Sequence, residues 1–516
     1  MRIRRTLAAL GCLTVLAAAA ACSSEPQPST DPAAKTLTIA ISGPPTLDPY
    51  KANIDPNNIS TVQLAYASLI RLNADRSFSP DLAESFGYTD KQNKIFQMKL
   101  RSGLTFADGT PLDAAAVVAS LKYLLKVSPK AQTWTGTITD ITAADAQTVV
   151  VTNSAPNPVM RQIFSQAVLS GSVISPKGLA DPTALAKQTF GAGPYVLDAA
   201  QTVPNDHYTY LPNPKFWNKS AQYWQKVVVR VIPDTNARVQ AIQSGQVDFV
   251  SLTSDAGPAV KATGLPYATA GIAVVGMELA DRDGAVAPQL KDVRVRQALN
   301  YAIDRAAITK AIFGTFAVPT SQMAAPGFDG YSKELDDRYP YDPEKAKSLL
   351  AEAGFPNGFT LKVETQQGFG ISIVAQAVVA QWKKIGVEVE LTTDTQTAQW
   401  LTNVTSKKFP VMGFAYGNLP TYLTSLDFML PRPGPFNPFA SGDAKLSQLL
   451  TAAAAEPDQA KQTALFQQAA GQMIELAWLA PVIRLQGLAV TGPRIGGYEQ
   501  TADYGLPNVT TLRPKG

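Results

Sequence analysis

The scarcity of cysteine and histidine limits how this chain can be stabilised. Among its 516 residues only two are cysteines, Cys12 and Cys22, and only one is a histidine, His207. Removal of a leader that ends before Cys22 would leave a single cysteine, so no intramolecular disulfide can form. Zinc sites built from four cysteines, or from cysteine and histidine pairs, are excluded for the same reason. A hydrophobic core must therefore hold the fold together, and we expect no metal site and no cofactor.

The N-terminus has the features of a secretory leader. Three arginines precede an apolar run, Leu7–Ala21, which is shorter than the roughly 20 residues that a membrane-spanning helix needs. Small residues then lead to Cys22, and the pattern resembles a bacterial lipobox, although Ala19 stands where leucine is usual. We therefore expect a signal peptide over 1–21, lipidation of Cys22, and a lipid-anchored linker over 22–35. The alternative is ordinary cleavage that leaves Cys22 unmodified.

Strand and helix patterns alternate along the rest of the chain. Residues 35–41 place apolar side chains at every second position, which is typical of a half-buried strand. Asp342 suits an N-cap, Pro343 a first helical turn and Gly354 the left-handed position after a helix. Further strands are predicted at 226–232, 359–364 and 387–391, and further helices at 293–303 and 305–313. Residues 431–438 are predicted to form a surface loop, with a role at a cleft rim as the alternative. This alternation favours the α/β class.

Composition and motifs argue for binding rather than catalysis. The formal net charge is +4, and no cluster of lysine and arginine suggests a nucleic-acid partner. No Gly-Lys dipeptide is present, so there is no phosphate-binding loop, and no Gly-x-Ser-x-Gly motif occurs. His207 lies in an alternating, strand-like stretch, where a structural or solvent-facing role is expected. We predict no catalytic residues and no enzymatic activity, with an exported hydrolase or a cell-surface scaffold as the alternative.

Six sequence blocks, in order along the chain, resemble one protein family. They are similar to those of the extracytoplasmic solute-binding proteins of peptide-type ABC importers, family 5, which includes oligopeptide, dipeptide and nickel receptors. The most diagnostic block is a strand that leads into Asp108-Gly109-Thr110-Pro111 and a helix. The blocks lie at 45–49, 96–112, 191–195, 238–248, 292–305 and 341–347.

The resemblance implies two α/β lobes joined by two hinge strands, with an extra small domain inserted in the first lobe. The hinge is expected near 274–275 and 480–483. The expected ranges are 36–66, 186–275 and 484–516 for lobe I, 67–185 for the inserted subdomain and 276–483 for lobe II.

The resemblance also implies partners and a location. A monomeric receptor would bind a small solute between its lobes and deliver it to an ABC permease with cytoplasmic ATPases. It would work outside the cell, anchored to the cell membrane as a lipoprotein through Cys22.

The resemblance points to two ligand-binding segments. One is the Leu-Asp-Pro loop, with Thr46 and Leu47, and the other is a stretch expected in the second lobe. We also consider two tryptophans as stacking surfaces, and core packing is the alternative for every aromatic residue. The candidates from the second lobe and the tryptophans are Phe414, Ala415, Tyr416, Gly417, Asn418, Trp134 and Trp400.

The second segment departs from the family pattern. Family receptors for peptides carry an aspartate there that pairs with the α-ammonium of the ligand, whereas this chain has Ala415-Tyr416, and the next carboxylate is Asp427. Because an ammonium in a desolvated cleft needs a partner, a receptor for free-amine peptides is disfavoured. The single His207 likewise disfavours a histidine-assisted nickel complex. The expected solute is peptide-like, opine-like or sugar-like.

Overall fold

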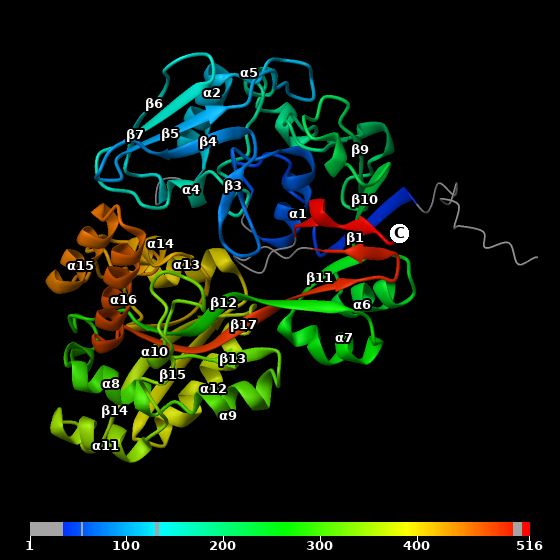
Figure 1. The fold of residues 1–516 in the computed structure, drawn as a ribbon. Helices are drawn as coiled ribbons and strands as arrows, with labels where there is room; N and C mark the ends of the chain where they lie inside the picture. The colour runs from blue at the N-terminus through cyan, green and yellow to red at the C-terminus, as the bar shows by residue number, and fades with distance from the viewer. Residues whose placement is uncertain (1–34, 53–54, 129–133, 499–507) are drawn as a thin grey trace, which may run out of the picture.

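The structure is a computed structural model that describes residues 35–52, 55–128, 134–498 and 508–516 (Figure 1). The expected signal peptide and Cys22 lie outside these residues. Figure 1 shows two bodies, one at the lower left and one that extends from the right-hand side over the top. Two long strands, β12 (Tyr267–Leu279) and β17 (Leu479–Thr491), join them. No helix in the described ranges is both long enough and apolar enough to cross a bilayer.

One mixed sheet of eleven strands runs through both bodies. Its order is β15-β14-β16-β12-β17-β11-β1-β10-β9-β8, and β13 also pairs with β17. One end, which we call the first lobe, contains β1 (Thr36–Ile41), β8 (Tyr195–Leu197), β9 (His207–Pro212), β10 (Lys226–Val231) and β11 (Phe249–Thr253). The other end, the second lobe, contains β13 (Ala317–Pro319), β14 (Phe359–Gln366), β15 (Val387–Asp394) and β16 (Val411–Gly417). Strands β12 and β17 belong to both.

Helices cover the sheet in both lobes. The first lobe has α1 (Pro56–Ala65), α6 (Thr235–Gln243) and α7 (Gly257–Thr263). The second lobe has α8 (Val293–Tyr301), α9 (Arg305–Ile312), α10 (Lys333–Asp336), α11 (Pro343–Glu352), α12 (Ile371–Lys383), α13 (Thr397–Thr405), α14 (Thr421–Phe428), α15 (Ala444–Ala455) and α16 (Gln459–Glu475). The chain ends with a small antiparallel pair, β18 (Ile495–Gly497) and β19 (Arg513–Pro514).

A separate four-stranded antiparallel sheet, in the order β4-β5-β7-β6, forms the inserted subdomain. Its strands are β4 (Ala83–Tyr88), β5 (Ile95–Leu100), β6 (Ile138–Ala143) and β7 (Thr148–Asn153). The hairpin of β2 (Ile70–Leu72) and β3 (Phe78–Pro80) lies beside it, with helices α2 (Ala114–Val127), α4 (Met160–Ile163) and α5 (Pro176–Ala180). In Figure 1 it sits above helices α14 to α16.

The hydrophobic core is continuous from the inserted subdomain into the second lobe. One buried cluster contains Phe96 and Phe164 of the inserted subdomain together with Leu423 of α14 and Phe466 of α16. A second cluster, which includes Trp382, fills the rest of the second lobe. Burial of this extent is a major source of stability for the fold.

The locally encoded elements match the sequence predictions. Helix α11 begins directly after Asp342, whose carboxylate accepts from the backbone N–H of Lys345 at 2.9 Å, and Gly354 lies beyond its end at φ +92°. The prediction of a surface loop at 431–438 is wrong in part. Phe436 packs on the main core, and Asn437 is fully buried with its amide donating to two backbone carbonyls.

Two carboxyl groups meet at the edge of the second lobe. Glu364 on β14 is fully buried, and the amide of Asn403 on α13 contacts both its carboxyl, at 3.4 Å, and that of Asp394, at 2.9 Å. Burial raises the pKa of Glu364 to about 8, and a hydrogen bond with Asp394 adds to the rise. Glu364 is therefore protonated in the folded state at neutral pH.

This pair predicts a pH-dependent loss of stability. Because the folded-state pKa of Glu364 lies above its unfolded value, its contribution is fully present below about pH 4.5 and is lost as pH rises through about 8. Glu364→Gln is neutral at every pH, so we expect its melting temperature to exceed that of the wild type by a few degrees at pH 8 and to match it at pH 5. Thermal melts across this range measure the difference, and Glu388→Gln, at an exposed position of β15, is the control. Parallel curves for Glu364→Gln and wild type would contradict the assignment.

Candidate functional site

The two lobes meet where β12 and β17 pass from one to the other. The first part of β12 pairs with the stretch of β17 that also pairs with β11, and its last part pairs with β16. The register of the β12–β17 pair shifts between Gly271 and Ala273, at this crossing. A side chain at Gly271 would come within 2.7 Å of the amide nitrogen of Asn418, so glycine at this position leaves room for the Asn418 side chain. The expected hinge ranges, 274–275 and 480–483, stay predictions.

The segment 414–418 lies at the end of β16, beside this crossing. Phe414, Tyr416 and Asn418 are buried, and Ala415 and Gly417 are half-buried. The Tyr416 hydroxyl donates to the Asp427 carboxylate, and its ring makes edge contacts with Phe428 and Phe436 at 4.8 and 5.4 Å between centroids. The Asp427 carboxylate, the next one along the sequence, therefore does lie at this segment, but the Tyr416 hydroxyl already donates a hydrogen bond to it.

Trp400 lies next to the same aromatic cluster. Its ring, on α13, is 6.3 Å from that of Phe436, which also contacts Tyr416. The indole Nε1 of Trp400 is buried and has no hydrogen-bond partner among the described residues, and the same holds for Oδ1 of Asn418. Buried polar atoms without partners are costly and rare, so each requires an explanation.

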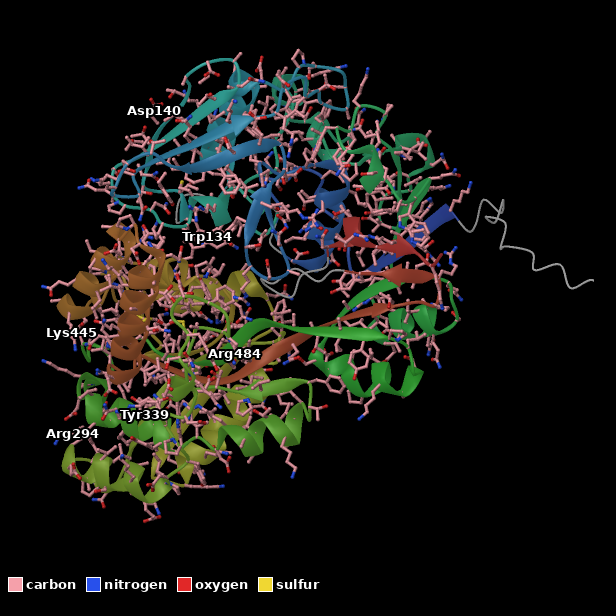
Figure 2. The ribbon with its side chains drawn as sticks, in the orientation of Figure 1. Trp134, Asp140, Arg294, Tyr339, Lys445 and Arg484 are labelled. Atoms are coloured by element: carbon pink, nitrogen blue, oxygen red, sulfur yellow. The ribbon has the colours of Figure 1, made fainter. Side chains whose placement is uncertain are left out.

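The three remaining candidates are held in the other body. Thr46 is exposed and donates its backbone N–H to Asn58 at 2.7 Å, while Leu47 is buried and its carbonyl accepts from the Tyr66 hydroxyl. Trp134 is buried in the core of the inserted subdomain, and Figure 2 places it at the side that faces the second lobe. The Phe436 ring thus contacts both Trp400 and Tyr416. The contacts given above for Thr46, Leu47 and Trp134 are with residues of the first lobe and the inserted subdomain.

No sequence signal pointed to Arg484, which lies on β17 near the crossing (Figure 2). Its side chain is buried and donates to the Thr320 hydroxyl and to the Ala324 carbonyl, both at 3.0 Å, and forms an ion pair with Asp336 at 3.5 Å. Carbon atoms of the same side chain approach Gly271. Arg484 therefore ties β17 to the second lobe.

Polar contacts join the inserted subdomain directly to the second lobe. The Tyr422 hydroxyl on α14 donates to the Pro156 carbonyl at 3.1 Å. The Asn93 amide donates to the carbonyls of Ala454 and Glu456, at 2.9 and 3.2 Å, at the C-terminal end of α15. In this structure the inserted subdomain and the second lobe are therefore in direct contact.

A cleft of about 430 Å³ remains in this interface. The β2–β3 hairpin, α4, the segment 327–331, Pro420 and the start of α16 line it. None of the sequence-predicted site residues is among its lining residues. The described ranges contain no group of three or more histidine, cysteine, aspartate or glutamate side chains that could hold a metal ion.

His207 is a partly exposed residue of the first lobe. It lies at the start of β9, half-buried, and its Nδ1 is 2.6 Å from the carboxylate of the adjacent Asp206. The prediction of a structural or solvent-facing imidazole agrees with this position.

Comparison with known proteins identifies relatives. The glutathione-binding protein GsiB of Escherichia coli K12 is 28% identical over 405 residues, which cover 75% of this chain and 73% of the relative. Among solved structures, HbpA2 from Haemophilus parasuis has a TM-score of 0.80 at 23% identity, over 93% of this chain and all of the other. AgaA from A. tumefaciens R10, in complex with agropinic acid, has a TM-score of 0.77 at 24% identity, over 93% of this chain and 98% of the other.

The expected two-lobed α/β fold is therefore confirmed. The family model described as bacterial extracellular solute-binding proteins, family 5 (middle part), matches residues 77–431, which is more than half of the chain. The relatives are binding proteins rather than enzymes. The chain belongs to the bacterial extracellular solute-binding proteins of family 5, the substrate receptors of peptide- and nickel-type ABC importers.

Proposed function

We propose that this receptor is a monomeric, lipid-anchored protein without enzymatic activity, and that it closes on a polar organic solute that is not held by an α-ammonium group. The observation that carries the proposal is the pair of unpartnered polar atoms at predicted site residues, Trp400 Nε1 and Asn418 Oδ1. One is a donor and the other an acceptor, which suits a solute with amide, hydroxyl or carboxylate groups.

The surroundings of Tyr416 support the absence of an ammonium anchor. Ala415 and Tyr416 occupy the place of the family aspartate, and the Asp427 carboxylate accepts a hydrogen bond from the Tyr416 hydroxyl. A peptide ammonium would have to compete for this carboxylate in a desolvated setting. Of the relatives, AgaA binds agropinic acid, a polar organic compound, whereas the glutathione that GsiB binds carries a free α-amine.

The solute class is tested by ligand-induced thermal stabilisation. A ligand that binds only the folded state raises the melting temperature by mass action. We expect N-acetyl-alanyl-alanine to stabilise the protein at least as well as alanyl-alanine, because no carboxylate is reserved for the ammonium. Glutathione and agropinic acid complete the panel, and recovery of each compound intact after incubation distinguishes a receptor from a hydrolase. Stabilisation by the free-amine dipeptide alone would contradict the proposal.

The unpartnered indole is tested by a matched pair of variants. Trp400→Phe removes an N–H that has no partner, so we expect the melting temperature without solute to change little. Its affinity for a stabilising solute should fall about five- to tenfold, the effect of one hydrogen bond worth about 1–1.5 kcal/mol.

Trp382→Phe is the control, because the Trp382 indole N–H donates to the Leu299 carbonyl at 2.9 Å inside the core. This change should lower the melting temperature and leave solute affinity unchanged. Equal losses of stability in the two variants, with no loss of affinity in Trp400→Phe, would overturn the role of Trp400.

The anchor is tested at Cys22. If the cysteine carries the acyl chains, the wild-type protein sediments with membranes and incorporates labelled palmitate, whereas Cys22→Ala is found in the soluble fraction without label. Membrane association of Cys22→Ala equal to that of the wild type would show that another feature holds the protein there. One acyl chain binds only marginally, so stable anchoring requires more than one.

A further inference from the structure

The cleft between the inserted subdomain and the second lobe has a positive lining. Two arginines contribute to it, Arg76 from the β2–β3 turn and Arg161 from α4, and the one acidic residue among its lining residues is Asp329. The Asp329 carboxylate accepts from the backbone N–H of Thr421 at 3.0 Å, at the start of α14. Burial raises the pKa of Asp329. Hydrogen bonds from Thr421 and from the neighbouring backbone partly offset this rise. The Asp329 carboxylate is thus engaged by the start of α14.

Arg161 has hydrogen-bonding capacity that the protein does not use. Its Nε is buried, and no described residue accepts a hydrogen bond from it. A buried guanidinium N–H without an acceptor is costly, and a carboxylate matches the geometry and charge of a guanidinium group.

Arg76 is fixed in place by the second lobe. Its guanidinium lies over the Phe328 ring, 3.7 Å from the centroid. Gly327, at φ +86°, makes room for it, since a side chain there would come within 3.1 Å of Arg76 Nε. Arg76 itself has the unusual φ of +69°. These features hold a cation at the cleft wall, and the contact crosses from the inserted subdomain to the second lobe.

Aromatic rings and amides complete the lining. Phe78, Phe328 and Tyr331 supply apolar surface, and Gln459 and Gln462 of α16 supply amide groups. The volume of about 430 Å³ lies within the range of small-molecule sites. Positive charge, an unused N–H and aromatic walls together suit a small organic anion with an apolar part.

We propose that this cleft is a second binding site, separate from the predicted one at 414–418, and that it takes an organic carboxylate. The carboxylate binds Arg161, and the apolar part packs against the rings of the cleft. Because the lining comes from both sides of the interface, the bound anion stabilises the contact between the inserted subdomain and the second lobe.

The test uses N-acetylphenylalaninate and its neutral amide as a matched pair of probes on the purified protein. We expect the carboxylate to raise the melting temperature and to bind in calorimetry with millimolar or better affinity, and the amide to bind at least tenfold more weakly. Arg161→Gln should weaken carboxylate binding tenfold or more, and Arg161→Lys should restore part of it. Arg294→Gln is the control, because Arg294 is exposed and pairs with Asp292 on the surface.

Two outcomes would overturn the proposal. One is the absence of carboxylate binding to the wild type up to about 10 mM, near the weak end of small-ligand affinity. The other is carboxylate binding that Arg161→Gln leaves unchanged. Binding that Trp400→Phe weakens and Arg161→Gln does not would assign the probe to the 414–418 site, and it would also refute the second site.

Discussion

The antiparallel pairing of β12 with β17 joins the first lobe to the second lobe. The register runs from Tyr267 opposite Val490 to Glu278 opposite Leu479, so each strand serves the first lobe at one end and the second lobe at the other. The ladder resists separation of the lobes, and its register shifts at two places, between Gly271 and Ala273 and between Val275 and Gly276. Asn418 and Arg484 both approach Gly271, so the predicted binding segment and the crossing strands are in direct contact.

Hydrogen bonds between the two bodies add to the hydrophobic core that is continuous from the inserted subdomain into the second lobe. The hydrogen bonds of Tyr422 with Pro156 and of Asn93 with the end of α15 each contribute only about 0.5–1.5 kcal/mol net. A solute that contacts both bodies binds the closed arrangement more tightly than the open one. It therefore shifts the open–closed equilibrium towards the closed arrangement. On this account, the unpartnered atoms of Trp400 and Asn418 are satisfied when a solute is bound.

How much the sequence could predict depended on how local the signal was. Asp342, Pro343 and Gly354 encode α11 within one short stretch, and alternation in 35–41 encodes β1, so both were predictable. Phe436 lies in a proline-rich loop, and only the tertiary fold brings its ring against Trp400 and Tyr416. Arg161 and Phe328 likewise come from segments far apart, so neither gave a signal for a shared cleft. Family resemblance supplied the fold, while the proposed solute class rests on side chains that differ from the family pattern.

Native mass spectrometry tests the central claim, that the closed receptor holds a small polar organic solute. The purified protein without a tag, incubated with a small-molecule extract of the growth medium, is ionised gently and then under denaturing conditions. The account predicts folded ions that carry additional non-covalent mass, and that this mass disappears on unfolding and belongs to an organic compound without a required free α-amine. Folded ions with the same mass as the denatured chain, or an adduct that is a free-amine peptide, would contradict it.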